Sequence, residues 1–238
     1  MKKTIFAVLT AVVMMVACSQ KPAPAENEKQ YVINGTVEGF ADGDTVMLVD
    51  LNNDSVEIQL VKDGKFTFTG TLDQAKPVFI EFYNDRVEPM AESAILLEDT
   101  IFTVKIVAGG NNSIEGGPLQ RIFREMTASS LSDAKQIDSL MAKVDAGGLS
   151  EAEVLAVKGQ VDSIARLQAK SHVDFLIARM PSEFSNVAAP MVAINLRFIR
   201  DAVGDTTQIY RMLDAFAEKQ PDAYYYQVLK KELEDHRK

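Results

Sequence analysis

The sequence predicts an α+β fold, in which an N-terminal antiparallel β-sandwich or partial barrel is followed by a C-terminal helical segment. The first observation is a series of short β-type runs, spaced roughly ten residues apart, between Tyr31 and Gly117. The second is a change of apolar period after Pro118, from that of a strand towards that of a helix. The third is a hydrophobic content of 47% in 238 residues, which fits one or two globular domains.

The first seventeen residues have the pattern of a secretory signal peptide. A basic head, Met1-Lys2-Lys3, precedes the apolar run Thr4–Ala17, which is shorter than the about 20 apolar residues of a spanning helix. Met15-Val16-Ala17 directly before Cys18 resembles the lipobox of bacterial lipoproteins, in which the cysteine becomes lipidated and N-terminal. We expect a signal peptide over 1–17 and a lipid anchor on Cys18. An ordinary secretion signal followed by a chance cysteine is the alternative.

Cys18 is the only cysteine of the chain, so lipidation there leaves the mature protein without a thiol. This excludes thiol catalysis, disulfide exchange and cysteine metal sites for this chain. Removal of Lys2 and Lys3 with the signal leaves 23 basic against 34 acidic residues, a net charge of about −11. Such a charge disfavours nucleic acid and anionic lipid surfaces as partners.

Residues 18–30 are expected to form the lipidated cysteine and a solvated tether, because the stretch contains two prolines and is otherwise mainly polar. Some surface-exported lipoproteins resemble one another in carrying acidic residues directly after Cys-Ser. Here Gln20, Lys21 and Pro22 occupy that place, which favours the periplasmic side of the outer membrane. The expected location is therefore the cell envelope, with the membrane contacted through the lipid.

The β-rich domain is expected over residues 31–117. The pairing register of one hairpin can be predicted from its apolar residues. Val56, Ile58 and Leu60 share one face of a strand, and Phe66 and Phe68 share one face of the next strand. A three-residue loop places the two apolar sets on the same face, whereas a two-residue loop separates them. We therefore expect the loop to span residues 62–64, with a positive φ at Gly64. The expected strands are 31–37, 45–49, 55–61, 65–69, 77–83, 93–97 and 101–107.

Several stretches of this half resemble the module called domain of unknown function 4369. They are Tyr31–Gly39, Asp42–Leu48, the Val61-Lys-Asp-Gly-Lys-Phe66 segment, Ile95–Ile101 and Ile114–Gly117. In that family the module often lies in envelope lipoproteins, upstream of a helical segment and a thioredoxin-like thiol–disulfide oxidoreductase domain. No catalytic residues are assigned to the module itself, so the resemblance implies none here.

The helical region is expected over residues 118–238. Ser150-Glu-Ala-Glu153 is a capping box that opens a long helix, with its apolar stripe at Val154, Val157, Val161 and Ile164 and its end before Pro181. A further helix is expected from about Val187, with Pro190 near its start or kinking it. The other expected helices are 119–128, 132–144, 209–220 and 223–236, with Asp205-Thr-Thr-Gln208 as a cap before the third of these.

This half is similar to the helical stretch before the thioredoxin-like domain of longer relatives, including the segment Met180–Val187. No Cys-x-x-Cys follows in this sequence, so the oxidoreductase function implied by the longer architecture is not transferred. An accessory role beside a separate thioredoxin-like partner remains as an alternative hypothesis.

The motifs for binding calcium, phosphate or a metal through histidine are incomplete in this sequence. We therefore expect no cofactor, no metal and no catalytic residue. Asp50-Leu-Asn-Asn-Asp54 begins like a calcium loop but lacks its glycine and its glutamate. The glycine pairs at 109–110 and 116–117 lack the spacing of a phosphate-binding loop. His172 has no ligand residue four positions away on either side, so a packed or surface histidine is expected.

Two groups of side chains have both a functional and a purely structural interpretation. Glu92, Glu98 and Asp99 flank one β segment and could frame the acidic site of a hydrolase, or be solvated turn charges. Tyr224, Tyr225 and Tyr226 point about 100° apart on a helix, so one or two must lie near the surface. Core packing is one interpretation of these tyrosines, and a contact surface for a sugar or a partner protein is the other.

The sequence therefore predicts a non-enzymatic, lipid-anchored envelope protein whose β-rich module binds an unidentified ligand. Its expected partners are the membrane, through the lipid, and an envelope protein or a glycan. The thiol–disulfide accessory and the hydrolase with an unrecognised acidic site remain the two alternatives.

Overall fold

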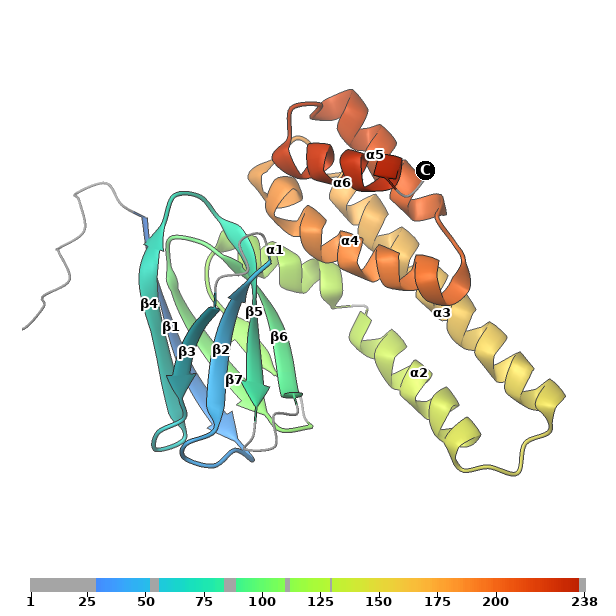
Figure 1. Ribbon diagram of the computed structural model, residues 1–238, viewed down its shortest axis with the longest axis horizontal. Coiled ribbons are helices and arrows are strands. Elements are labelled where there is room, and N and C mark those ends of the chain that lie inside the picture. Colours follow the sequence, from blue (N-terminus) through green and yellow to red (C-terminus); the bar gives the residue numbers. More distant parts are fainter. Residues whose placement is uncertain (1–28, 52–55, 84–88, 110–111, 129, 236–238) are drawn as a thin grey trace, which may run out of the picture.

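A computed structural model describes residues 29–51, 56–83, 89–109, 112–128 and 130–235 of the chain (Figure 1). The signal peptide, Cys18 and nearly all of the tether lie outside the described residues, as do residues 52–55 of the calcium-loop-like segment. Among the described residues, no helix is both long enough and apolar enough to cross a membrane.

The N-terminal part is a β-sandwich of two four-stranded sheets, and helices follow it, which confirms the predicted α+β class (Figure 1). Sheet A has the strand order β4-β1-β7-β8, and sheet B has the order β3-β2-β5-β6. The strands are β1 (Lys29–Glu38), β2 (Thr45–Asp50), β3 (Val56–Leu60), β4 (Lys65–Leu72), β5 (Lys76–Tyr83), β6 (Pro89–Leu97), β7 (Ile101–Val107) and β8 (Ser113–Glu115).

One strand pair departs from the predicted antiparallel arrangement. β1 lies antiparallel to β4 but parallel to β7, with Val32 opposite Ile101. The inward residues of both sheets form one apolar core, which includes Ile33, Phe68, Phe82 and Phe102, each at most 1% exposed. Burial of such alternating apolar faces drives the two sheets together.

Gly35 makes room for an aromatic cluster inside the sandwich. A Cβ at Gly35 would lie 2.0 Å from ring atoms of Phe66, so only glycine allows this ring to cross β1. The Phe66 ring also packs edge-on against Phe82, with 5.4 Å between ring centroids.

The expected hairpin between residues 55 and 69 is wrong in its loop and in its pairing. Lys62 and Lys65 exchange both backbone hydrogen bonds at 3.0 Å, so the loop has two residues, Asp63 and Gly64. Their φ angles of 51° and 67° are those of a type I′ turn, and the positive φ expected at Gly64 is confirmed.

The reason for the error is that the chain changes sheets at this turn. β3 pairs with β2 in sheet B, whereas β4 pairs with β1 in sheet A. Ile58 and Leu60 therefore do not share a ladder with Phe66 and Phe68. The two aromatic side chains are buried, while Ile58 and Leu60 are 60% and 59% exposed.

Six helices are described after the sandwich, and all of them except α4 begin within two residues of the expected positions. They are α1 (Pro118–Thr127), α2 (Ser130–Asp145), α3 (Glu151–Ile177), α4 (Glu183–Val203), α5 (Thr207–Lys219) and α6 (Tyr224–Asp235). The capping box at Ser150 is confirmed, since Ser150 and Glu153 exchange side-chain and backbone hydrogen bonds. The Asp205 carboxylate accepts the backbone N–H of Thr207 at 2.9 Å, at the start of α5.

The expected start of α4 at Val187 is wrong, because the helix begins one turn earlier. Ser182 is the N-cap, and its side chain accepts the backbone N–H of Ser185, whose hydroxyl in turn accepts the backbone N–H of Ser182. The helix continues through Pro190, which is buried among the residues of the helical core. Tertiary packing thus offsets the backbone hydrogen bond that proline cannot make.

The helices pack against the outer face of sheet B, on the side of β5 and β6 (Figure 1). Leu96 of β6 belongs to the apolar core of the helices, and Phe79 and Ala94 pack against that core. The link between the two parts is also polar. The Glu98 carboxylate accepts the backbone N–H of Leu119 and Gln120 at the start of α1, at 2.8 and 3.1 Å.

Helices α2 and α3 form an antiparallel hairpin that extends away from the sandwich (Figure 1). The predicted stripe of α3, from Val154 to Ile164, is half-buried along this hairpin. Only the C-terminal part of α3 enters the helical core, through Ala169, Val173 and Leu176.

Candidate functional site

Two adjoining cavities lie where the sandwich meets the helices. One is lined by the turn before β5 and by the N-terminal turns of α4 and α6, and its volume is about 340 Å³. The other lies over the end of β4 and has a similar volume of about 340 Å³. Gln74, Lys76 and Tyr224 line both cavities, so we treat the two as one feature, the Tyr224 groove. Its further polar lining residues include Asp50, Thr71, Asp73, Glu183, Asn186 and Asp222.

An ion pair between the buried Asp50 and the half-buried Lys76 forms the wall of the groove on the sandwich side. Asp50 ends β2 and is 3% exposed, and its Oδ2 accepts a hydrogen bond from Lys76 Nζ at 2.6 Å. Lys76 begins β5, two residues before the strand position opposite Asp50. A carboxylate so well buried requires a cation or donors, and Lys76 supplies both.

A second polar pair lies close to Asp50 at the same end of the sandwich. Tyr31 of β1 donates its hydroxyl hydrogen to Glu57 Oε1 of β3, at 2.9 Å. Burial, reinforced by this hydrogen bond, raises the pKa of the Tyr31 hydroxyl well above its usual range. A small void of about 20 Å³ touches Tyr31, Glu57, Asp50 and Lys76 together. The two sheets are thus tied at this end by polar side chains.

The three consecutive tyrosines have three different environments. Tyr224 is 70% exposed and lines both cavities. Tyr225 is buried, with its hydroxyl 3.4 Å from Arg197 Nη2, and Tyr226 is half-buried and stacks on Phe216 with 6.3 Å between centroids. Of the three tyrosines, only Tyr224 is exposed, and Tyr225 is a buried lining residue of one cavity.

The side chains around Tyr224 define the chemistry of the groove. Four carboxylates, Asp50, Asp73, Glu183 and Asp222, face one ammonium group, that of Lys76. The amides of Gln74 and Asn186 add donors and acceptors. An anionic ligand is disfavoured by this charge balance, whereas an uncharged or cationic polar ligand with an apolar face is suited to it.

Most of these residues could not be recognised from the sequence. Gln74, Lys76, Asn186 and Asp222 come from segments far apart in the chain and belong to no motif. The only usable signal was the run of tyrosines, which must expose part of its surface on any helix.

The other predicted candidates do not converge on a site. Glu92 lies opposite Glu81 in the ladder of β5 and β6, and burial followed by the Glu81 charge raises the pKa of Glu92. Glu98 caps α1, and Asp99 accepts the backbone N–H of Gln30 at 3.0 Å. Glu98 and Asp99 thus each have a structural partner, whereas Glu92 faces the like charge of Glu81.

His172 is packed between helices, which is one of the two environments expected from the sequence. It is 4% exposed, and its Nε2 lies 2.8 Å from Ser130 Oγ at the start of α2. Burial lowers the pKa of the His172 imidazole, a shift that the charge of Asp133 opposes. Among the residues that the structure describes, no cluster of metal-ligating side chains is present.

The fold and the site together define a two-sheet β-module joined to a helical segment, with a polar groove at the junction. Residues 31–123 match the model of the protein family described as "Domain of unknown function (DUF4369)". The match spans the sandwich and most of α1, which extends the predicted boundary of the module at residue 117. No curated protein matches the chain.

Proposed function

We propose that this protein is a lipid-anchored component of the cell envelope that binds a ligand in the Tyr224 groove without transforming it. The observation that carries the proposal is the exposed Tyr224 ring between two cavities that share Gln74 and Lys76. An aromatic ring that lines a polar concavity offers a ligand an apolar face beside hydrogen-bonding groups, the combination typical of small-molecule sites.

The chemistry of the groove favours a glycan over an extended protein surface. The ring of Tyr224 offers a flat apolar face of the kind on which a pyranose can lie. The carboxylates of Asp73, Glu183 and Asp222 accept hydrogen bonds from hydroxyl groups, and the Asn186 amide both donates and accepts them. Because the acidic side chains predominate, the favoured glycan is neutral or bears amino groups rather than carboxylates.

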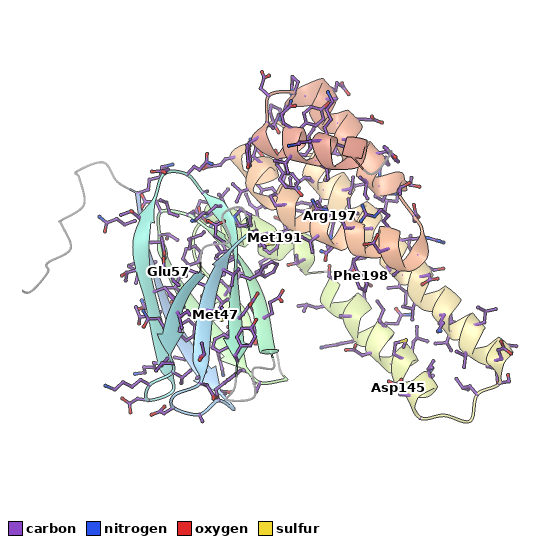
Figure 2. All side chains as sticks on the ribbon, viewed as in Figure 1. Met47, Glu57, Asp145, Met191, Arg197 and Phe198 are labelled. Atoms are coloured by element: carbon purple, nitrogen blue, oxygen red, sulfur yellow. The ribbon has the colours of Figure 1, made fainter. Side chains whose placement is uncertain are left out.

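The test compares two exposed aromatic residues of the same molecule. Tyr224→Ala should weaken binding to a panel of neutral and amino-bearing oligosaccharides by roughly tenfold or more, as expected for an aromatic anchor. Phe198 of α4 is 73% exposed but lines neither cavity, so Phe198→Ala is the matched control and should bind like wild type. Figure 2 shows Phe198 on α4, apart from the N-terminal turns that form the groove.

The panel is immobilised, and the full-length lipidated protein is applied in detergent micelles at two salt concentrations. Absence of binding to every oligosaccharide, or equal losses for the Tyr224 and Phe198 variants, would refute a glycan site in the groove. Preferential binding of carboxylate-bearing sugars would refute the charge argument.

The lipid anchor rests on the lipobox and is tested separately. Cells that express the wild type or Cys18→Ala are supplied with a radiolabelled fatty acid, and the protein is then recovered from membrane fractions. Label in the wild type that is lost in the Cys18→Ala variant is expected, since diacylglycerol is attached to this sulfur. Equal labelling of the two proteins would refute the anchor and the outer-membrane location facing the periplasm that we propose with it.

A further inference from the structure

The two edge strands of sheet B differ in whether another part of the chain covers them. At β6 the backbone N–H of Leu96 donates to Gln120 Oε1 at 2.8 Å, and α1 packs along this strand. At the opposite edge, β3 pairs with β2, and within the described part of the chain no further strand pairs with β3. An uncovered edge is a template for pairing with another strand.

The direction of the free backbone groups on β3 follows from its ladder with β2. Val61 directly follows β3, and its N–H donates to the carbonyl of Asp44 at 2.9 Å. In an antiparallel ladder the groups that face the partner alternate along the strand, so Glu57 and Gln59 also face β2. Ile58 and Leu60 therefore direct their N–H and C=O groups to the open edge.

The edge strand β3 exposes two apolar side chains beside the polar Glu57 and Gln59, whereas the exposed side chains of the edge strand β4 are all polar. Ile58 and Leu60 are 60% and 59% exposed. β4, which forms the edge of sheet A beyond the same turn, exposes Lys65, Thr67 and Thr69 instead. Residues 56–60 contain neither lysine nor proline, and their one charged side chain, Glu57, is hydrogen-bonded to Tyr31.

We propose that β3 pairs with β3 of a second copy of this chain, antiparallel and with the two-fold axis through Ile58. The two Ile58 residues then exchange their free N–H and C=O groups across the axis. The same register places Glu57 opposite Gln59 of the second copy, twice. Each pair joins a carboxylate to an amide donor, and no like charges face one another.

The hydrogen bond that Glu57 already makes is compatible with pairing of the two β3 strands. Glu57 accepts the Tyr31 hydroxyl through one oxygen, Oε1, and a carboxylate has further acceptor sites for Gln59. In Figure 2, Glu57 lies on β3 at the side of the sandwich away from the helices, so the helical part does not obstruct a second copy there. The two sheets B would form one continuous eight-stranded sheet.

The experiment introduces a cysteine at the axis of the full-length protein in its membrane. Opposed residues of a hydrogen-bonded pair have Cα atoms about 5.5 Å apart, within the range that a disulfide spans. Ile58→Cys should therefore form a disulfide-linked dimer under mild oxidation. Thr67→Cys, on the exposed face of β4, is the matched control and should remain monomeric, as should the wild type.

A charge substitution tests the register itself. Adding Gln59→Glu to Ile58→Cys places carboxylates opposite one another in both pairs and should lower the dimer yield roughly tenfold, whereas Gln59→Lys should preserve it. A monomeric Ile58→Cys protein, equal cross-linking of Thr67→Cys, or a yield insensitive to residue 59 would overturn the proposal. Cross-linking of Ile58→Cys to a different protein would also overturn it, in favour of an extended segment of that protein at the same edge.

Discussion

The ion pair between Asp50 and Lys76 gives the sharpest prediction about the groove. Lys76→Met keeps the length of the side chain but removes the ammonium group that lies 2.6 Å from a carboxylate only 3% exposed. Removing one partner of a fully buried ion pair typically costs about 3–5 kcal/mol. Because the Lys76 side chain is 31% exposed and water screens its charge, we expect a smaller loss of about 2 kcal/mol.

The measurement is urea unfolding at pH 7, followed by circular dichroism, for a double-mutant cycle. Asp50→Asn removes the charge with little change of shape, and the double variant Asp50→Asn/Lys76→Met removes both charges. The double variant should be more stable than the sum of the single losses predicts, by about 1 kcal/mol or more, because no buried charge remains. Additive losses, or a Lys76→Met variant as stable as the wild type, would refute the reasoning.

Two further predictions concern buried titratable groups outside the groove. Burial lowers the pKa of His172, so the neutral imidazole stabilises the fold above the ordinary histidine pKa and this stability is lost as the pH falls below it. His172→Gln should unfold in urea with a smaller decrease in midpoint between pH 7.5 and pH 5 than wild type, and an identical decrease would contradict this role. Glu98→Ala removes the acceptor of two backbone N–H groups of α1 and should cost about 1–3 kcal/mol in unfolding free energy, whereas Glu98→Gln keeps an acceptor oxygen and should lose less. Equal losses for the two variants would show that the capping bonds contribute nothing.

Features that depend on residues close together in the chain were predicted best. The capping box at Ser150, the order of strands and helices, and the positive φ of Gly64 depend on residues close together in the chain, and all are confirmed. The start of α4 was missed because Pro190 was expected near the start of the helix or at a kink, whereas the helix begins at Ser182 and continues through the buried proline.

The β3–β4 error has a different cause, since the local pattern contained no sign of it. A two-residue turn and a three-residue turn both suit Asp63-Gly64, and the choice was made by assuming that Ile58 and Phe66 share a face. The chain instead passes from one sheet to the other, which buries Phe66 against Gly35 and Phe82 and leaves Ile58 at an edge. The consequence is the exposed edge on which the proposed pairing rests.

The sequence by itself determined the α+β class and the restriction of all thiol chemistry to Cys18. These properties follow from local periodicity, composition and counts of residues. Only the tertiary structure decided which tyrosine is exposed, which cation faces Asp50 and which strand edge is left open. Each of these depends on contacts between segments distant in the chain, whose geometry is fixed when the two sheets and the helices bury their apolar faces together.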